Sequence, residues 1–152
     1  MALTNNITLR LVGTISDTIG VASVDASVNK TITSALSGSD LLWTIAGETP
    51  STPHVIAYDL ADESLTDPLG NTVNMDSISM IFFRNSGENA MTLGGGADDI
   101  DVLADGIIVP VGGVVLLLGD YAVGASADQI TVTGTDEGDT YEILVVGIAP
   151  EP

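Results

Sequence analysis

Residues 107–118 read IIVPVGGVVLLL, and this stretch decides the fold class. It is too short to cross a membrane as a helix, and Pro110 and the pair Gly112-Gly113 rule out a regular helix through its middle. Two consecutive glycines suit a two-residue hairpin turn, and β-branched residues flank them. The stretch therefore predicts a strand, a tight turn and a second strand. Because residues 114–118 are all apolar, we expect the second strand to be buried on both faces.

The rest of the chain repeats this pattern of short extended segments between turns. Turn signals recur about every 8–12 residues, and no long segment has the 3.6-residue period of a helix. We expect further strands near residues 7–13, 20–26, 30–33, 41–45, 54–60, 77–84, 90–93, 128–133 and 140–148. Ile130 and Val132 are expected to face inward. The pattern predicts an all-β, antiparallel β-sandwich, and a jelly roll is favoured because it leaves few exposed edges.

A segment rich in glycine and proline at residues 47–53, GETPSTP, is typical of a linker. It predicts an N-terminal arm or small β lobe over residues 1–50 and a β-sandwich domain over residues 51–152. A turn is expected at residues 37–40. For residues 41–45 the alternative to a strand is a short helix capped by Ser39 or Asp40. Trp43, the only tryptophan, is expected to anchor the core, with an oligomer contact as the alternative.

The charge of the chain excludes several classes of function. The 152 residues include 21 acidic and three basic side chains, for a formal net charge of −18. Such a surface repels phosphate backbones and anionic lipids, so we expect neither a nucleic acid nor a membrane as partner. With no cysteine, disulfides and thiolate chemistry are excluded. No signal peptide is visible at the N-terminus, and no apolar run is long enough to span a membrane.

No catalytic constellation is evident, so we predict a non-enzymatic protein without catalytic, cofactor-binding or metal-ligating residues. His54 is the only histidine, and no nucleophile-elbow pattern accompanies it. One histidine without cysteine cannot supply a zinc site. A pair of acids could serve glycoside hydrolysis, but aromatic residues make up only 4% of the chain, which argues against a sugar-binding cleft.

Bound calcium is the one ion that the sequence raises as a hypothesis, because acidic residues cluster near turns. The three clusters are Asp59/Asp62/Glu63, Asp98/Asp99/Asp101 and Asp136/Glu137/Asp139. Residues 94–101, GGGADDID, resemble one imperfect copy of the calcium-binding nonapeptide repeat, which works by stacking several copies. With so many acids, some clustering arises by chance. Arg10 and Arg84 are each interpreted as solvated strand residues, with an ion pair across a subunit contact as the alternative.

The order of motifs from residue 77 onward resembles a known class of protein. A strand is followed by NSG (85–87), NAMTLGGG (89–96), IVPVGG (108–113), an apolar strand, ADQITVTG (127–134) and TYEILVVG (140–147). This order resembles small β-sandwich virion proteins of tailed bacteriophages, of the kind that decorate or cement the outside of the head. The first 50 residues resemble no family.

The resemblance implies a non-enzymatic virion protein that is made in the host cytoplasm and binds the major capsid protein lattice, often as a homotrimer. It would stabilise the shell in proportion to its occupancy. On this hypothesis the region up to Pro53 is an arm that reaches a neighbour. The alternatives are a receptor-binding or adhesive β domain of a tail fibre or surface protein, a tail or head-completion protein, and a carboxylate-dependent hydrolase.

Overall fold

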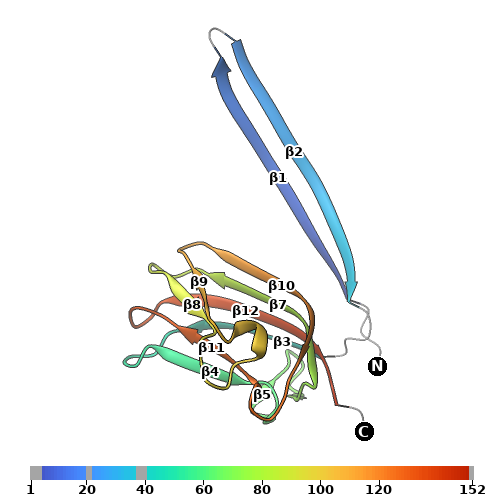
Figure 1. Cartoon of the computed structure of the whole chain (residues 1–152), viewed down its shortest axis with the longest axis vertical. Helices are drawn as coiled ribbons and strands as arrows, with labels where there is room; N and C mark the ends of the chain where they lie inside the picture. The colour runs from blue at the N-terminus through green and yellow to red at the C-terminus, as the bar shows by residue number, and fades with distance from the viewer. Residues whose placement is uncertain (1–4, 20–21, 37–40, 151–152) are drawn as a thin grey trace. The chain divides into compact units, whose positions relative to one another are not determined.

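The computed structural model describes residues 5–19, 22–36 and 41–150 (Figure 1). The chain divides into two compact units, one spanning Thr4–Ser37 and the other Met1–Leu3 with Gly38–Pro152. Within the described residues all regular structure is β-strand except one short 3-10 turn, η1 (Asp101–Leu103). The larger unit is an antiparallel β-sandwich, which confirms the predicted fold class.

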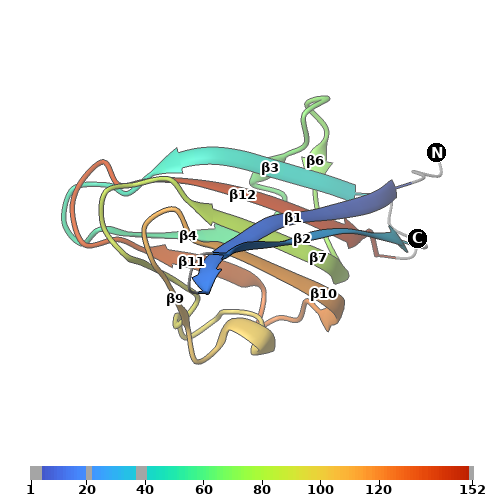
Figure 2. The same ribbon diagram turned by 90° about the horizontal axis from the view of Figure 1, so that it is seen from above.

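Two four-stranded sheets form the sandwich, and Figure 2 shows the strands of the first sheet side by side. The first sheet has the order β10-β7-β12-β3, and the second has the order β4-β11-β8-β9. A two-stranded ribbon of β5 and β6 lies between β4 and β7 in the chain. The bounds are β3 (Leu41–Glu48), β4 (Val55–Asp59), β5 (Leu65–Thr66), β6 (Thr72–Val73), β7 (Ser77–Asn85), β8 (Met91–Leu93), β9 (Ile107–Val109), β10 (Val114–Ala122), β11 (Gln129–Thr133) and β12 (Thr140–Ile148).

The eight sandwich strands are arranged as one folded antiparallel ribbon. β8 pairs with β9, β7 with β10, β4 with β11 and β3 with β12. Each pair in this order encloses the preceding pair in the sequence. Successive pairs belong to alternate sheets, which is the order of a jelly roll. The innermost turn of this ribbon is the segment between β8 and β9, residues 94–106. Its entry requires Gly94, which has φ +86°, and an added Cβ there would lie 2.2 Å from the carbonyl oxygen of Leu103.

Residues 107–118 do form two strands joined by a turn, but the hairpin prediction is wrong. β9 and β10 belong to different sheets, so the turn carries the chain across the sandwich. The Gly113 N–H donates to the carbonyl of Pro110 (2.8 Å), and Gly112 has φ +70°. The Asn85 N–H donates to the Gly113 carbonyl, and the Gly112 N–H donates to the Asn85 carbonyl (both 3.0 Å). The glycines therefore make a corner between sheets, held by the end of β7.

The predicted burial of residues 114–118 on both faces is also wrong. Their strand, β10, is the outermost strand of its sheet, and Val114 and Leu118 are 55% and 47% exposed. Val115 and Leu117 pack against the core from the inner face. A uniformly apolar segment fits a central strand or an edge strand equally well, because its composition does not report how many neighbours it has.

The segment at residues 47–53 is not a linker: residues 47 and 48 end β3, and residues 49–53 form a loop within the sandwich. β3 pairs with β12 from Gly47 to Leu41, so the units separate after Ser37 and not at residue 50. Thr49 is 2% exposed, and its N–H donates to the Asp139 carbonyl (2.9 Å). Glycine and proline mark a loop that crosses between sheets as readily as a flexible connection. The strand predicted at residues 41–45 is confirmed over the helix alternative, and the turn predicted at residues 37–40 lies outside the described residues.

Aromatic residues from both sheets meet in the core, as expected for Trp43, which is 3% exposed. The rings of Trp43 and Tyr58 lie 4.9 Å apart, and those of Phe83 and Tyr141 lie 5.9 Å apart. The hydroxyls of Tyr58 and Tyr141 share a hydrogen bond of 2.5 Å. Burial raises the pKa of Tyr141, so this pair stays neutral and joins the two sheets without a buried charge. Ile130 and Val132 are buried, as predicted.

The smaller unit is a long β-hairpin of β1 (Asn5–Ile19) and β2 (Ala22–Leu36). Its antiparallel register runs without interruption from the pair Asn5 and Leu36 to the pair Ile19 and Ala22. The short strands expected at residues 7–13 and 30–33, and the part of the strand expected at residues 20–26 that begins at Ala22, are thus pieces of one ladder, whereas residues 20 and 21 lie outside the described residues.

Candidate interaction surfaces

His54 has a local structural contact rather than a place in a catalytic group. Its Nδ1 lies 3.0 Å from the carbonyl oxygen of Pro50, within the same loop. Its backbone carbonyl accepts a hydrogen bond from the Gly134 N–H (2.9 Å). The residue also has φ 60°, in the left-handed region. These contacts shape the loop between β3 and β4.

The acidic loop at residues 98–101 does not present its carboxylates to one point. Asp99 is 4% exposed, and its carboxylate accepts hydrogen bonds from the N–H groups of Gly96 (2.6 Å) and Thr131 (2.8 Å). Asp98 and Asp101 are exposed. Across the residues that the structure describes, no three acidic or histidine side chains gather as metal ligands would. Asp99 therefore holds the loop against β11.

In the cluster at Asp59, Asp62 and Glu63, the carboxylates of Asp59 and Asp62 likewise accept hydrogen bonds from nearby backbone N–H groups. Asp59 Oδ1 accepts from the N–H groups of Ala61 (2.9 Å) and Asp62 (3.0 Å), and Asp62 Oδ1 accepts from the Ser64 N–H (2.7 Å). Such bonds are typical of turns initiated by aspartate. The local hydrogen bonds to Ser64 lower the pKa of Asp62.

The third cluster contains a buried anchor, Asp139, which is 4% exposed. Burial alone would raise the pKa of Asp139. The backbone N–H groups of Asp136, Thr135 and Glu88 and the side chain of Asn89 donate to its carboxylate, and together they lower that pKa. This carboxylate joins the β11–β12 turn to the loop after β7, so its role in the fold is structural.

Among the described acidic residues, Asp128 has a carboxyl group whose pKa is raised by its surroundings in the fold. Burial raises the pKa of Asp128, and the charge of Asp59 raises it further, with smaller contributions from Asp98 and Asp62. A carboxyl whose pKa is raised on folding binds its proton more tightly in the folded state. Its ionised form therefore opposes folding at neutral pH, and this effect disappears as the pH falls through the raised pKa.

We expect the Asp128→Asn variant to be more stable than the wild type at pH 7, by about 0.5 kcal/mol or less because the site is partly solvated. Thermal unfolding at pH 7 and at about pH 4 measures this, and the gain should shrink at the lower pH. Asp105→Asn removes the same charge from an exposed loop and serves as control. A variant no more stable than this control would contradict the prediction.

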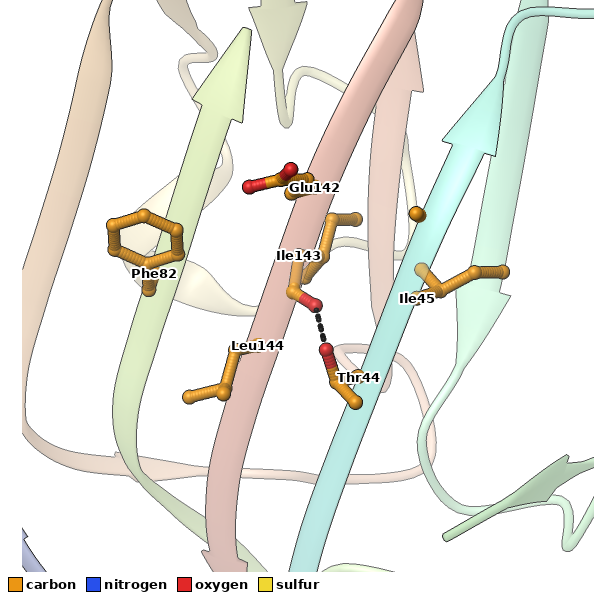
Figure 3. Close-up of a pocket in the computed structure, with 7 residues that line it drawn as sticks. Thr44, Ile45, Phe82, Glu142, Ile143 and Leu144 are labelled. Carbon is orange, nitrogen blue, oxygen red and sulfur yellow. Dashed lines mark hydrogen bonds between the residues drawn. The ribbon is translucent and has the colours of Figure 1, made fainter. Parts of the chain in front are cut away.

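The outward face of the first sheet carries an open depression of about 260 Å³ (Figure 3). Thr44, Phe82, Glu142 and Leu144 line it from three adjacent strands. The Thr44 hydroxyl donates to the carbonyl of Ile143 (2.9 Å), so it is already engaged. Glu142 is the only acidic or basic side chain among the residues that line this depression, and the other lining side chains are apolar except Thr44.

Glu142 also forms an ion pair beside this depression. Its Oε2 lies 3.7 Å from Nη1 of Arg84, and each side chain is about half exposed. The pair joins the neighbouring strands β7 and β12. Arg84 is thus a half-exposed strand residue that is also paired with Glu142 within the chain, and an ion pair across a subunit contact stays a prediction.

The register of the β1–β2 hairpin sorts its residues by polarity. Positions of odd number in β1 share one face with their partners in β2, which have even numbers. This odd face carries most of the apolar residues: Ile7, Leu9, Leu11, Ile15, Ile19, Ala22, Val24, Ala26, Val28, Ile32 and Leu36. The even face is mainly threonine, serine and asparagine, with Val12 and Ala35 as its apolar members. The alternation of apolar and polar residues is visible in the sequence once β1 and β2 are each known to be one continuous strand.

The hairpin unit carries no net charge, although the whole protein is strongly acidic. Residues 4–37 contain two basic residues, Arg10 and Lys30, and two acidic ones, Asp17 and Asp25. The other unit therefore holds one basic and 19 acidic residues, and it carries the whole formal net charge of −18.

No protein-family model matches this chain, and no curated protein or solved structure matches it significantly. None of the described residues forms a helix long and apolar enough to cross a membrane.

Proposed function

We propose that this chain is a non-enzymatic virion structural protein that binds the outside of a bacteriophage capsid and stabilises it, acting at the capsid surface. The resemblance of residues 77–152 to head-decorating β-sandwich proteins supports the proposal. The observation that carries it is the hairpin, a separate unit with an apolar face and no net charge, attached to a highly acidic sandwich.

A surface that covers the apolar face of the hairpin would stabilise the hairpin. A two-stranded hairpin alone is marginally stable in water, and each of these strands has 15 residues, a ladder about 50 Å long. Covering the apolar face removes that surface from water, which favours association by about 25 cal/mol per Å² of apolar area. A long, narrow, apolar face suits a seam between capsid subunits better than a compact ligand.

The distribution of charge also supports binding through the hairpin rather than through the sandwich. The neutral hairpin can approach a protein shell without electrostatic penalty, whereas the acidic surface of the sandwich keeps the protein soluble. A protein that binds only assembled shells stabilises them by mass action, by about 2.7 kcal/mol per site at a free concentration 100 times Kd. No chemical step is needed for this function.

Two double variants of the full chain test the proposal. Leu9→Asp with Ile15→Asp places two charges on the odd face, and Thr8→Asp with Thr14→Asp places the same two charges on the even face. Sedimentation with capsids of the phage that encodes the chain measures binding. We expect the odd-face variant to bind at least tenfold more weakly and the even-face variant to bind like the wild type.

Equal binding by both double variants would contradict the proposal, and so would a wild type that does not bind capsids. Attachment of the wild type to host cells in place of capsids would identify a receptor-binding domain instead. Deletion of residues 2–46 is less suitable as a test, because it would remove most of β3 from the sandwich.

A further inference from the structure

The outermost strand of the first sheet, β10, has an open edge. In the part of the chain that the structure describes, β10 pairs with β7 alone, so its other edge presents backbone N–H and C=O groups. The Leu118 carbonyl also accepts a hydrogen bond from the Tyr121 hydroxyl (3.2 Å). Residues 114–118 at its start are all apolar, and both Val114 and Leu118 are about half exposed. Natural proteins protect such edges with charges, proline or short length. Residues 114–118 have none of these protections.

The other edge strands of the sandwich differ from β10. β9 has three residues, and β4 has five and ends in Asp59. β3 is nearly as long, but it ends in Glu48 and contacts β6 of the small ribbon. β10 combines nine residues with a charge-free first half, and its only acidic residue is Asp120. It is therefore the edge best suited to pairing with another strand.

A second copy of this chain fits the β10 edge because residues 114–118 are uncharged and an antiparallel edge is complementary to itself. Two chains of net charge −18 repel each other, so copies can meet only where neither presents unpaired carboxylates. Residues 114–118 are uncharged, and Arg84, the cross-strand neighbour of Val114, is already paired with Glu142. A basic partner would be drawn to the acidic surface elsewhere. The edge of an antiparallel strand is also complementary to the same strand turned by 180°.

The regular part of β10 defines the register of such a pair. Its pairing with β7 is uninterrupted from Val114 to Leu118, and the register then shifts before Tyr121. The centre of the regular segment is Leu116. A two-fold axis there places Leu116 of the two copies side by side and Val114 opposite Leu118 of the second copy. Asp120 then falls opposite a residue beyond the end of the strand, so no two carboxylates meet.

We propose that two copies of this chain associate through β10, edge to edge and antiparallel, about a two-fold axis at Leu116. The two four-stranded sheets then form one continuous sheet of eight strands. Because the contact uses the same edge on both copies, it closes on itself and leaves no open β10 edge for further growth. The contact is independent of capsid binding by the hairpin.

Light scattering coupled to size-exclusion chromatography tests this in the full chain. The expected mass is twice the chain mass of 15.5 kDa. Leu116→Lys and Leu116→Glu each bring like charges together at the axis, so each is expected to weaken association at least a hundredfold. An equimolar mixture of the two variants is expected to recover the dimer, since the axis then joins opposite charges.

Leu69→Lys is the matched control, because Leu69 is 86% exposed in the loop between β5 and β6, and this variant should remain dimeric. Trp43 fluorescence verifies folding. If Leu116→Lys does not fold, the double variant Val114→Lys with Leu118→Lys, at two half-exposed positions, places like charges opposite each other across the contact and gives the same readout. A monomeric wild type, a mass of three copies, Leu116 variants that stay dimeric, or a mixture that stays monomeric would each overturn the proposal. None of these results bears on capsid binding.

Discussion

The Asn85→Ala variant is expected to lose about 4 kcal/mol of unfolding free energy, the largest loss that we predict for a polar residue. Asn85 is fully buried at the end of β7. Its Nδ2 donates to the carbonyls of Asn89 (2.8 Å) and Val109 (3.0 Å), and its Oδ1 accepts from the Gly87 N–H (2.9 Å). Truncation leaves these backbone groups without their partner, at about 1–3 kcal/mol for each that stays buried.

The loss should be large because one side chain joins two segments of the jelly roll, while the backbone hydrogen bonds of Asn85 remain in the variant. The backbone of Asn85 holds the corner at Gly112 and Gly113, and its side chain holds the end of β9 and the loop after β7. Urea unfolding followed by Trp43 fluorescence measures the change in unfolding free energy. Wild type and variant are compared with the same slope of unfolding free energy against urea concentration.

Asn71→Ala is the control, because Asn71 is exposed and its side chain donates to an exposed carboxylate of Asp67 (2.9 Å). We expect this control to lose less than about 1 kcal/mol. A loss of that small size in Asn85→Ala would show that other groups or water replace the side chain.

The Asp139→Asn variant is expected to lose about 3 kcal/mol at pH 7. The Asp139 carboxylate accepts hydrogen bonds from the N–H groups of Thr135 (3.3 Å), Asp136 (3.2 Å), Glu88 (3.3 Å) and Asn89 (3.3 Å). An amide has the same shape, but it has no negative charge and directs its own N–H donors toward one of these groups. Glu137→Gln, in the same turn and exposed, is the control for the lost charge.

The effect of Asp139 should depend on pH in a defined direction. Its pKa in the folded state is below the ordinary value of 3.8, so the ionised form stabilises the fold. That contribution is complete above pH 3.8 and is lost as the pH falls through the lower folded pKa. The stabilities of wild type and Asp139→Asn should therefore converge in acid. A difference that stays constant from pH 7 to pH 3 would contradict this assignment.

Some features of the sandwich followed from local sequence alone. Alternation of apolar and polar residues located β11 and placed Ile130 and Val132 inside, and turn residues located the ends of β7 and β12. These predictions succeeded because the side-chain period of a strand and the φ requirements of a turn depend on residues that are neighbours in the chain.

The candidate surfaces were less accessible to sequence reasoning. The two faces of the hairpin emerge only when Leu9 is known to pair with Ile32 and Ile15 with Ala26. The open edge at Leu116 was mistaken for the centre of the sandwich, because five apolar residues do not show whether a strand has one neighbour or two. The acidic clusters looked alike in sequence, yet Asp99 and Asp139 are buried anchors while Asp98 is exposed.

The amino-acid sequence by itself determined that this protein is a sandwich of short antiparallel strands, strongly acidic and free of thiol chemistry. The tertiary structure alone decided which strands lie at an edge and which carboxylates are used inside the fold. The reason is physical: the deciding contacts join residues far apart in the chain, such as Thr49 with Asp139, 90 positions away. Local periodicity does not contain such pairings.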